Sequence, residues 1–347
     1  MRRNLILFLV GTLAVSFIGR EIRLTALGSQ SSTAQAAHSV LLDLHVTDPS
    51  GRFVSGLTKS NFRVEENGTP EGITTVDAVE DNGVFTLLLD DIGVSPLRSG
   101  SVRALAHEFV ERHIGPTDRV RLVTTSRRKD LTLDFTSDKG RVLAAIDRFQ
   151  GGQGTGQASD GLDALYELHD QTASLSSDGR RKAIVFIGVG LPSGLYLAPS
   201  RLSTAAVFDL PRERTNARFD IRDVILAAAR NTVVISCLDA FGNVDQPSEL
   251  PDIVQYRLPF GDSVGGRTTM AFVARETGGT SLIQSNAIEP AFTEITEAER
   301  RYYRLAYIST NLVKDSQFAK VSVSTDERGL SVHTRSGVAA SPQKTTH

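Results

Sequence analysis

Short apolar runs alternate with helical segments from residue 84 to about residue 300, and this alternation restricts the chain to a small set of folds. The strand-like runs lie at 84–90, 120–124, 131–135, 183–189, 232–238 and 281–283, and the helical segments lie at 99–113, 139–149, 158–173, 220–230, 268–277 and 288–300. Alternation of this kind favours a parallel sheet with helices on both faces. We therefore predict an α/β fold with a doubly wound, mostly parallel sheet, in which the short and alternately polar run 131–135 forms an edge.

The residues before and after this region have a different pattern, which is typical of antiparallel strands. Runs at 40–46, 62–66 and 73–79 precede it, and runs at 302–309, 318–324 and 330–334 follow it. Neither set of short strands can bury its apolar face alone. We expect residues 37–82 and 301–338 to pair with each other in a small antiparallel β domain, beside an α/β domain at 83–300. The stretches 190–219 and 241–266 have no clear period and are read as irregular insertions.

Residues 1–36 have the composition of an export signal. Arg2 and Arg3 precede an apolar run at 5–19, and Ala34-Gln35-Ala36 offers small residues for cleavage. The apolar run is shorter than the roughly 20 residues that span a bilayer, which favours cleavage over an uncleaved membrane anchor. Both alternatives place the rest of the chain outside the cytoplasm, in the periplasm, at the cell envelope or in the medium.

Composition argues against several classes of function. The 347 residues include 38 basic and 40 acidic side chains that are mixed along the chain, so no basic stripe predicts a nucleic-acid partner. The single cysteine, Cys237, lies inside an apolar run, and we expect it to be a small buried side chain rather than a nucleophile. The one membrane contact that the sequence leaves open is an uncleaved anchor at 1–36.

The run 84–90 carries the strongest candidates for a functional site. It ends in two carboxylates, Asp90 and Asp91, and Ser95 follows four residues later. An apolar strand that delivers acidic and hydroxyl groups at its carboxyl end is how open α/β sheets build ligand sites. Two further candidates for the same edge are Thr155, within the glycine-rich segment 151–156, and Ser193, beyond the run 183–189.

Three other chemistries are disfavoured by the spacing of their residues. The segment 151–156 has neither a following lysine nor the dinucleotide spacing of a phosphate-binding loop. Ser193 lacks the Gly-x-Ser-x-Gly spacing of a hydrolase nucleophile, and Pro192 precedes it. His107 and His113 lie six residues apart and face different sides of one helix, which argues against a zinc site. We predict no catalytic residue and no cofactor.

The strand that ends in aspartate, the glycine-rich loop before a helix and the later apolar strand together resemble the von Willebrand factor A fold. More narrowly, residues 39–337 resemble the secreted VWFA-related family described from Acidobacteria, through the segments 47–68 and 302–307. The resemblance implies a metal-ion-dependent adhesion site built from Asp-x-Ser-x-Ser, a loop threonine and a later aspartate. Oxygen ligands of this kind suit Mg²⁺, and Mn²⁺ is the other ion that such a site would take.

This sequence departs from that pattern. Counting from Asp90, the two serine positions hold Ile92 and Val94, and Val189 stands where the later aspartate is expected. Counting from Asp91 keeps one serine, Ser95. The site is therefore predicted to be degenerate, and its candidate metal ligands are Asp90, Asp91, Ser95 and Thr155.

These observations favour a bacterial, non-enzymatic binding or adhesion module. We expect it to recognise a protein partner through the face at the carboxyl ends of the strands, lined by Asp91, Ser95, Thr155 and Ser193. The alternative is an extracytoplasmic enzyme, or a subunit of an enzyme complex, that uses a cleft in this face with 190–219 and 241–266 as lids. The lack of a nucleophile–base pair in the sequence argues against that alternative. A structural scaffold without any ligand is the third hypothesis.

Overall fold

The structure is a computed structural model, and it describes residues 38–154, 160–175, 179–191, 221–240, 263–309 and 318–339. All of these residues belong to one compact unit, Ala37–His347. The predicted export signal at 1–36 and most of the two predicted insertions lie outside the described residues. Within the described residues, no helix has the length and apolar character needed to cross a membrane.

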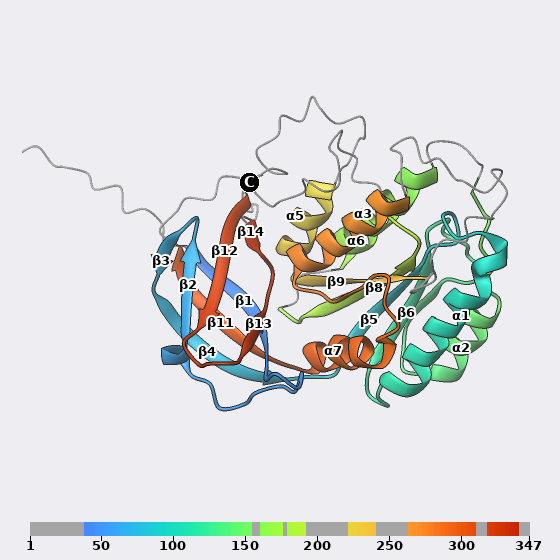
Figure 1. Cartoon of the computed structure of the whole chain (residues 1–347). Helices are drawn as coiled ribbons and strands as arrows, with labels where there is room; N and C mark the ends of the chain where they lie inside the picture. Colours follow the sequence, from blue (N-terminus) through green and yellow to red (C-terminus); the bar gives the residue numbers. More distant parts are fainter. Residues whose placement is uncertain are drawn as a thin grey trace, which may run out of the picture. The chain divides into compact units, whose positions relative to one another are not determined.

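A six-stranded sheet in the order β10-β9-β8-β5-β6-β7 forms the centre of the α/β part (Figure 1). Its strands are β5 (Val84–Leu89), β6 (Arg119–Thr124), β7 (Leu133–Thr136), β8 (Lys182–Gly188), β9 (Val233–Asp239) and β10 (Ser281–Leu282). β5 pairs in parallel with both β6 and β8, and β9 is parallel to both β8 and β10. β7, at one edge, is antiparallel to β6. The predicted doubly wound, mostly parallel sheet is confirmed.

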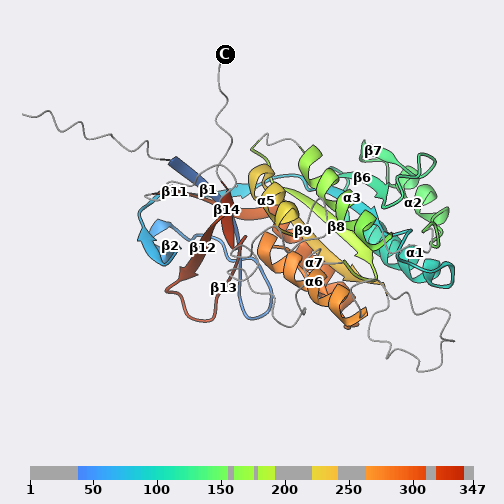
Figure 2. The ribbon, with the colours of Figure 1, turned by 90° about the horizontal axis from the view of Figure 1, so that it is seen from above.

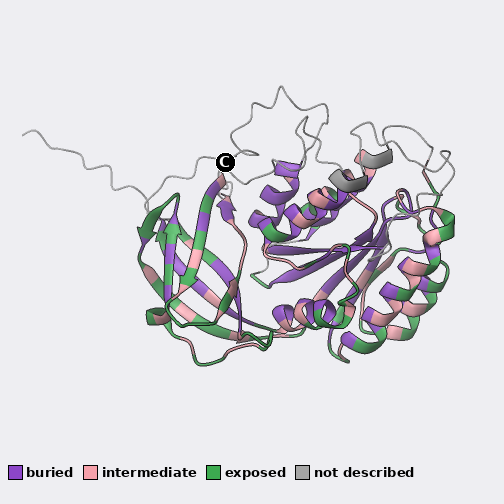
Figure 3. Ribbon diagram, viewed as in Figure 1, coloured by how far each residue is buried: buried purple, intermediate pink, exposed green. Residues whose placement is uncertain are grey.

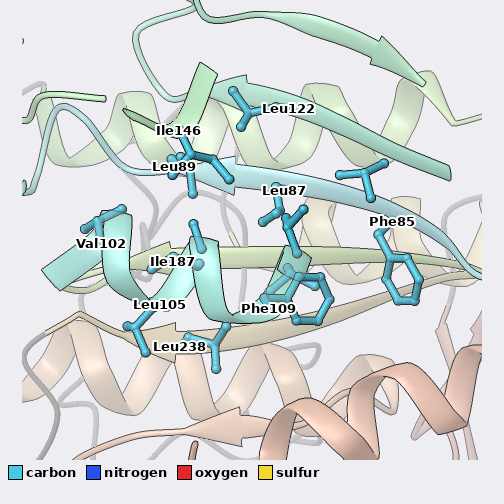
Figure 4. Close-up of a cluster of buried hydrophobic side chains, with 14 of the residues drawn as sticks. Phe85, Leu87, Leu89, Val102, Leu105, Phe109, Leu122, Ile146, Ile187 and Leu238 are labelled. Carbon is cyan, nitrogen blue, oxygen red and sulfur yellow. The ribbon is translucent and has the colours of Figure 1, made fainter. Parts of the chain in front are cut away.

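Helices cover both faces of this sheet (Figures 1 and 2). One face carries α1 (Ser99–Glu108), the π-helical turn η3 (Phe109–His113) that continues it, α2 (Lys139–Asp147) and α7 (Ile288–Arg300), and the other carries α3 (Asp160–Ser174), α5 (Ile221–Asn231) and α6 (Ser263–Thr277). Side chains alternate along β5, so that Leu87 and Leu89 pack toward α1 (Figure 4) while Leu88 packs toward α3 and α5. Because helices cover both faces, β8 and β9 are buried along their whole length (Figure 3).

The residues on either side of the α/β part form two four-stranded sheets. The first, in the order β13-β1-β11-β4, contains β1 (His38–Thr47), β4 (Ile73–Glu80), β11 (Arg301–Ser309) and β13 (Ser331–His333). The second, in the order β14-β12-β2-β3, contains β2 (Phe62–Glu66), β3 (Thr69–Glu71), β12 (Phe318–Thr325) and β14 (Gly337–Ala339). β1 pairs with β11 and β2 pairs with β12, and the two sheets share one apolar core. The two flanks therefore pair with each other in an antiparallel β structure, as predicted.

Some elements differ from the prediction in type or extent. The helix predicted at 99–113 is α-helical only to Glu108 and ends in the π-helical turn η3, in which the Ile114 N–H donates to the Phe109 carbonyl at 3.2 Å. The edge strand predicted at 131–135 begins two residues later, because the Leu131 N–H closes a turn onto the Arg128 carbonyl. β3 and β14 were not predicted, since three residues are too few to show an alternation.

Phe109 offers a direct test of the core on the α1 face of the sheet. Its ring is fully buried and lies 5.6 Å from the ring of Phe85 and 5.2 Å from that of Phe292, between centroids. Phe109→Ala should lower the free energy of unfolding by about 3–5 kcal/mol, as measured by urea unfolding followed by circular dichroism. Leu97→Ala is the control, because this side chain is 85% exposed, and it should change that free energy by less than about 0.5 kcal/mol. Equal losses in the two variants would contradict the packing described above.

Candidate functional site

The carboxyl ends of β5, β6 and β8 meet at one edge of the central sheet, which we call the top face. It comprises residues 90–98 after β5, residues 125–130 after β6 and residues 151–154 of the glycine-rich segment. The Asp90 N–H donates to the Ile187 carbonyl and the Thr125 N–H donates to the Leu89 carbonyl, both at 3.0 Å. The backbone hydrogen bonds thus continue past the ends of the strands and fix the backbone of Asp90 and Asp91.

Both oxygens of the Asp91 carboxylate accept hydrogen bonds from the loop after β6. Its Oδ1 accepts hydrogen bonds from the Ser126 N–H at 2.9 Å and the Thr125 hydroxyl at 3.0 Å, and its Oδ2 accepts one from the Ser126 hydroxyl at 2.6 Å. The side chain is fully buried, so these bonds replace the water that a carboxylate would otherwise need. Asp91 therefore fastens the loop after β5 to the loop after β6, and Thr125 and Ser126 are site residues that the sequence analysis missed.

Asp90 is also fully buried, but its carboxylate is only half satisfied. Oδ1 accepts from the Gly93 N–H at 2.8 Å and lies 3.1 Å from the Thr125 hydroxyl, which has one hydrogen to share between Asp90 and Asp91. Oδ2 has no hydrogen-bond partner of good geometry among the described residues, although the Val189 amide is close enough to favour the ionised form. Burial, aided by the nearby Asp91 charge, raises the pKa of Asp90 to about 6.

Glycines make room for the Asp90 carboxylate. A Cβ at Gly93 would lie 2.4 Å from Asp90 Oδ2, and a Cβ at Gly188 would lie 2.9 Å from Asp90 Cβ. Neither distance is tolerated by real side chains, so both positions have to remain glycine for Asp90 to sit where it does. Gly188 ends β8, and a Cβ there would also lie 2.6 Å from the ring of Phe186.

The first residues of the glycine-rich segment pack onto the loop after β5. The Gly152 N–H donates to the Val94 carbonyl at 2.7 Å, and the Gln153 N–H donates to the Asp91 carbonyl at 2.9 Å. A Cβ at Gly151 would lie 2.2 Å from the Val94 carbonyl oxygen, which explains the need for glycine at this contact. Segments that are about 60 residues apart in the sequence therefore form one continuous surface.

A third acidic side chain ends a strand of the same sheet. Asp239 closes β9, where it pairs in register with Gly188 of β8, and it is buried. Its Oδ2 lies 2.7 Å from Nε of Arg267, a buried residue of α6, so a guanidinium supplies the positive charge beside this carboxylate. The sequence analysis missed Asp239, although an apolar strand ending in aspartate is the same signal that identified Asp90.

Most carboxylate oxygens of the described top face already accept hydrogen bonds from the protein. Mg²⁺ and Mn²⁺ need oxygen ligands, several of which can be water, and Asp90 Oδ2 is the one carboxylate oxygen of the described top face without a partner. Val94 is fully buried in the core on the α1 side, and Val189 packs against the same core. The apolar residues at the positions where the resemblance implies metal ligands therefore pack in the core.

The structure brings together only part of the predicted site. Asp90, Asp91 and Ser95 lie in one loop, with Ser95 half-buried at the start of the short helical turn η2 (Pro96–Arg98). Thr155 and Ser193 lie outside the described residues, so their part in the site stays a prediction.

Solved structures similar to this chain are known, but the similarity is low. No family model matches the sequence, and no curated protein matches it. Among solved structures, an aerotolerance-related membrane protein from Bacteroides fragilis is 16% identical, with 63% of this chain and 98% of that chain covered and a TM-score of 0.39. The vWF domain of the type V pili tip protein Mfa5 from Porphyromonas gingivalis is 13% identical, with 63% and 95% covered and a TM-score of 0.37.

A third similar structure is the manganese-loaded TRAP protein from Plasmodium vivax, which is 10% identical, with 78% of this chain and 100% of that chain covered and a TM-score of 0.37. The mostly parallel sheet with helices on both faces matches the doubly wound α/β fold predicted from the sequence. The described sheet and helices form a doubly wound α/β fold, and the resemblance to the von Willebrand factor A fold rests on the sequence. The narrower resemblance to the family from Acidobacteria stays a prediction.

The raised pKa of Asp90 predicts a pH dependence of stability. Its pKa in the folded protein, about 6, lies above the ordinary value of 3.8, so the folded state binds this proton more tightly than the unfolded state does. The resulting contribution to stability is fully present below about pH 4 and is lost as the pH rises through about 6. Between pH 7 and pH 4, the free energy of unfolding of the wild type should therefore rise by up to about 3 kcal/mol relative to that of Asp90→Asn. Urea unfolding across this range measures the difference, and parallel curves for the two proteins would contradict the account of Asp90.

Proposed function

We propose that this protein is an exported, non-enzymatic binding module that recognises a protein partner through the top face of its von Willebrand A-type domain, with a degenerate metal-ion-dependent adhesion site. The observation that carries this proposal is the bonding of the top face. Asp91, Thr125 and Ser126 tie the loop after β5 to the loop after β6, and Gly152 ties the glycine-rich segment to the loop after β5. Three loops on a buried sheet thus form a rigid platform, which lowers the entropy lost on binding a partner.

The loop after β6 has a further attachment that stiffens this platform. Arg127, which follows the Asp91 contact, forms ion pairs with Glu167 and Asp170 of α3. Glu167 is buried, so its ion pair with Arg127 is less screened by water than an ion pair between two exposed side chains. The loop after β6 is therefore held at both its start and its middle.

The top face also carries an exposed apolar side chain. Leu97, in the helical turn η2, is 85% exposed, and a side chain of this size is a suitable anchor for a partner's pocket. Two hydrogen bonds hold this turn in place. The Ser99 hydroxyl donates to the Pro96 carbonyl at 2.8 Å and accepts from the Gly151 N–H at 2.9 Å. Leu97 is thus presented to solvent by a well-ordered turn.

The chemistry of the described residues favours binding over catalysis. The carboxylates at the centre of the top face are buried and hydrogen-bonded within the protein, and do not project toward a substrate. Cys237 lies buried in β9, and burial raises the pKa of its thiol well above the usual range, so the reactive thiolate does not form. Export, on which the site of action depends, is inferred from the pattern of residues 1–36.

Site-specific photocrosslinking in the producing organism tests the proposed partner face. A photoreactive amino acid in place of Leu97 should give a discrete crosslinked product with one protein, because this side chain would lie in the interface. The same amino acid in place of Glu111, an exposed residue of η3 that is not part of the top face, is the control and should not give that product. A product of equal yield from both positions, or none from position 97, would contradict recognition through this face.

The metal independence of the top face is tested by thermal unfolding. Millimolar Mg²⁺ should leave the melting temperature unchanged, because Asp90 Oδ2 is the one carboxylate oxygen of the described top face without a partner. An ion held in the folded state alone would instead raise it by an amount that grows with concentration. A rise of that kind in the wild type that disappears in Asp90→Asn would show that the adhesion site is functional and not degenerate.

A further inference from the structure

We propose that Glu108, His113 and Glu289 form a zinc-binding site where η3 meets α7. One ligand atom from each of these side chains lies within 4.8 Å of the other two. Two ligand atoms bound to one tetrahedral Zn²⁺ at about 2.0–2.2 Å lie about 3.3–3.6 Å apart, so side-chain rotations that bring these atoms roughly 1 Å closer complete the geometry. His113 Nε2 and Glu289 Oε2 are already 3.2 Å apart. The site is separate from the top face and shares no residue with it.

The π-helical turn brings the first two ligands together. Glu108 and His113 are five positions apart, and in an α-helix their side chains would point about 140° away from each other. Residues Phe109–His113 instead form a wider turn, closed by the hydrogen bond from Ile114 to Phe109, in which residues five apart are neighbours. Such turns occur frequently at functional sites. The α-helical spacing assumed from the sequence explains why no zinc site was expected at His113.

The three side chains combine a fixed ligand with two adjustable ones. The His113 side chain is 6% exposed, and its ring lies edge-on to Phe292 at 5.3 Å between centroids, so its position is set by the core. The Glu108 and Glu289 side chains are 30% and 55% exposed and are free to rotate toward an ion. Imidazole with two carboxylates suits Zn²⁺ better than Mg²⁺ or Ca²⁺, and three protein ligands with water in the fourth position are common for zinc.

The guanidinium of Arg112 balances the negative charge of Glu108 and Glu289. Its Nη1 lies 3.4 Å from Glu108 Oε1 and its Nη2 lies 3.6 Å from Glu289 Oε2, so a single guanidinium bridges the two carboxylates. Both contacts are long and the Arg112 side chain is 62% exposed, so these ion pairs are weak. Zn²⁺ therefore displaces the guanidinium, and Arg112 competes with the ion for the same carboxylates.

Isothermal titration calorimetry of the purified protein with Zn²⁺ tests this site. We expect one ion to bind at this site in the wild type, with an affinity at least ten-fold weaker in Glu289→Gln. Glu111→Gln is the matched control, because it removes a carboxylate from the same turn outside the group, and it should bind as the wild type does. Arg112→Gln should bind more tightly, since the competing guanidinium is gone. Circular dichroism confirms that each variant is folded.

Two results would overturn the proposal. The first is the absence of Zn²⁺ binding in the wild type, and the second is an equal affinity in Glu289→Gln and the wild type. Weaker binding in Arg112→Gln would equally contradict it, because the guanidinium would then support the site rather than compete for it.

Discussion

Two carboxylates buried at the end of one strand are the constraint on which the top face depends. β5 is covered on both faces, so Asp90 and Asp91 follow it into a region that water does not reach. A buried charge is costly unless the protein supplies hydrogen bonds, and Thr125 and Ser126 supply most of them. The need to satisfy these two side chains therefore explains why the loop after β6 packs against the loop after β5. The rigid surface that we assign to partner binding is a consequence of this arrangement.

The neighbouring strand β9 also ends in a buried aspartate, but a different group balances its charge. Asp239 of β9 is paired with the guanidinium of Arg267, whereas Asp90 keeps an unpartnered oxygen and a raised pKa. A strand end of this fold can thus balance its acidic residue with hydroxyl groups, with a basic side chain or by retaining a proton. None of these solutions requires a bound cation.

The β part of the molecule depends on the two ends of the chain meeting. β1 pairs with β11 across about 260 residues, and β2 pairs with β12 over a similar separation. Contacts of such long range are slow to form, so this part is expected to assemble after the α/β part has brought its own ends together. The α7 helix runs directly into β11, which gives the two parts a shared element.

The class of fold could be predicted from the sequence, but the hydrogen bonds of the candidate site could not. Apolar runs such as 183–189 and the alternation around them predict a buried parallel sheet, because burial on both faces depends on composition alone. The bonding of Asp91 was not predictable in the same way, since Thr125 and Ser126 follow a different strand and only the sheet order brings them close. The π-helical turn at Phe109–His113 was also missed, because it has the apolar spacing of an ordinary helix until its last residues.

We propose as the central claim that most carboxylate oxygens at the acidic end of β5 are satisfied from within the protein and that this end holds no metal ion. Crystals of the protein soaked in Mn²⁺ test it directly, through an anomalous difference map recorded at the manganese absorption edge. The account predicts no peak near Asp90 and Asp91, and the hydrogen bonds from Thr125 and Ser126 should be intact in the same crystals. A manganese peak about 2.2 Å from Asp90 Oδ2, with the Asp91 contacts rearranged around it, would contradict the account.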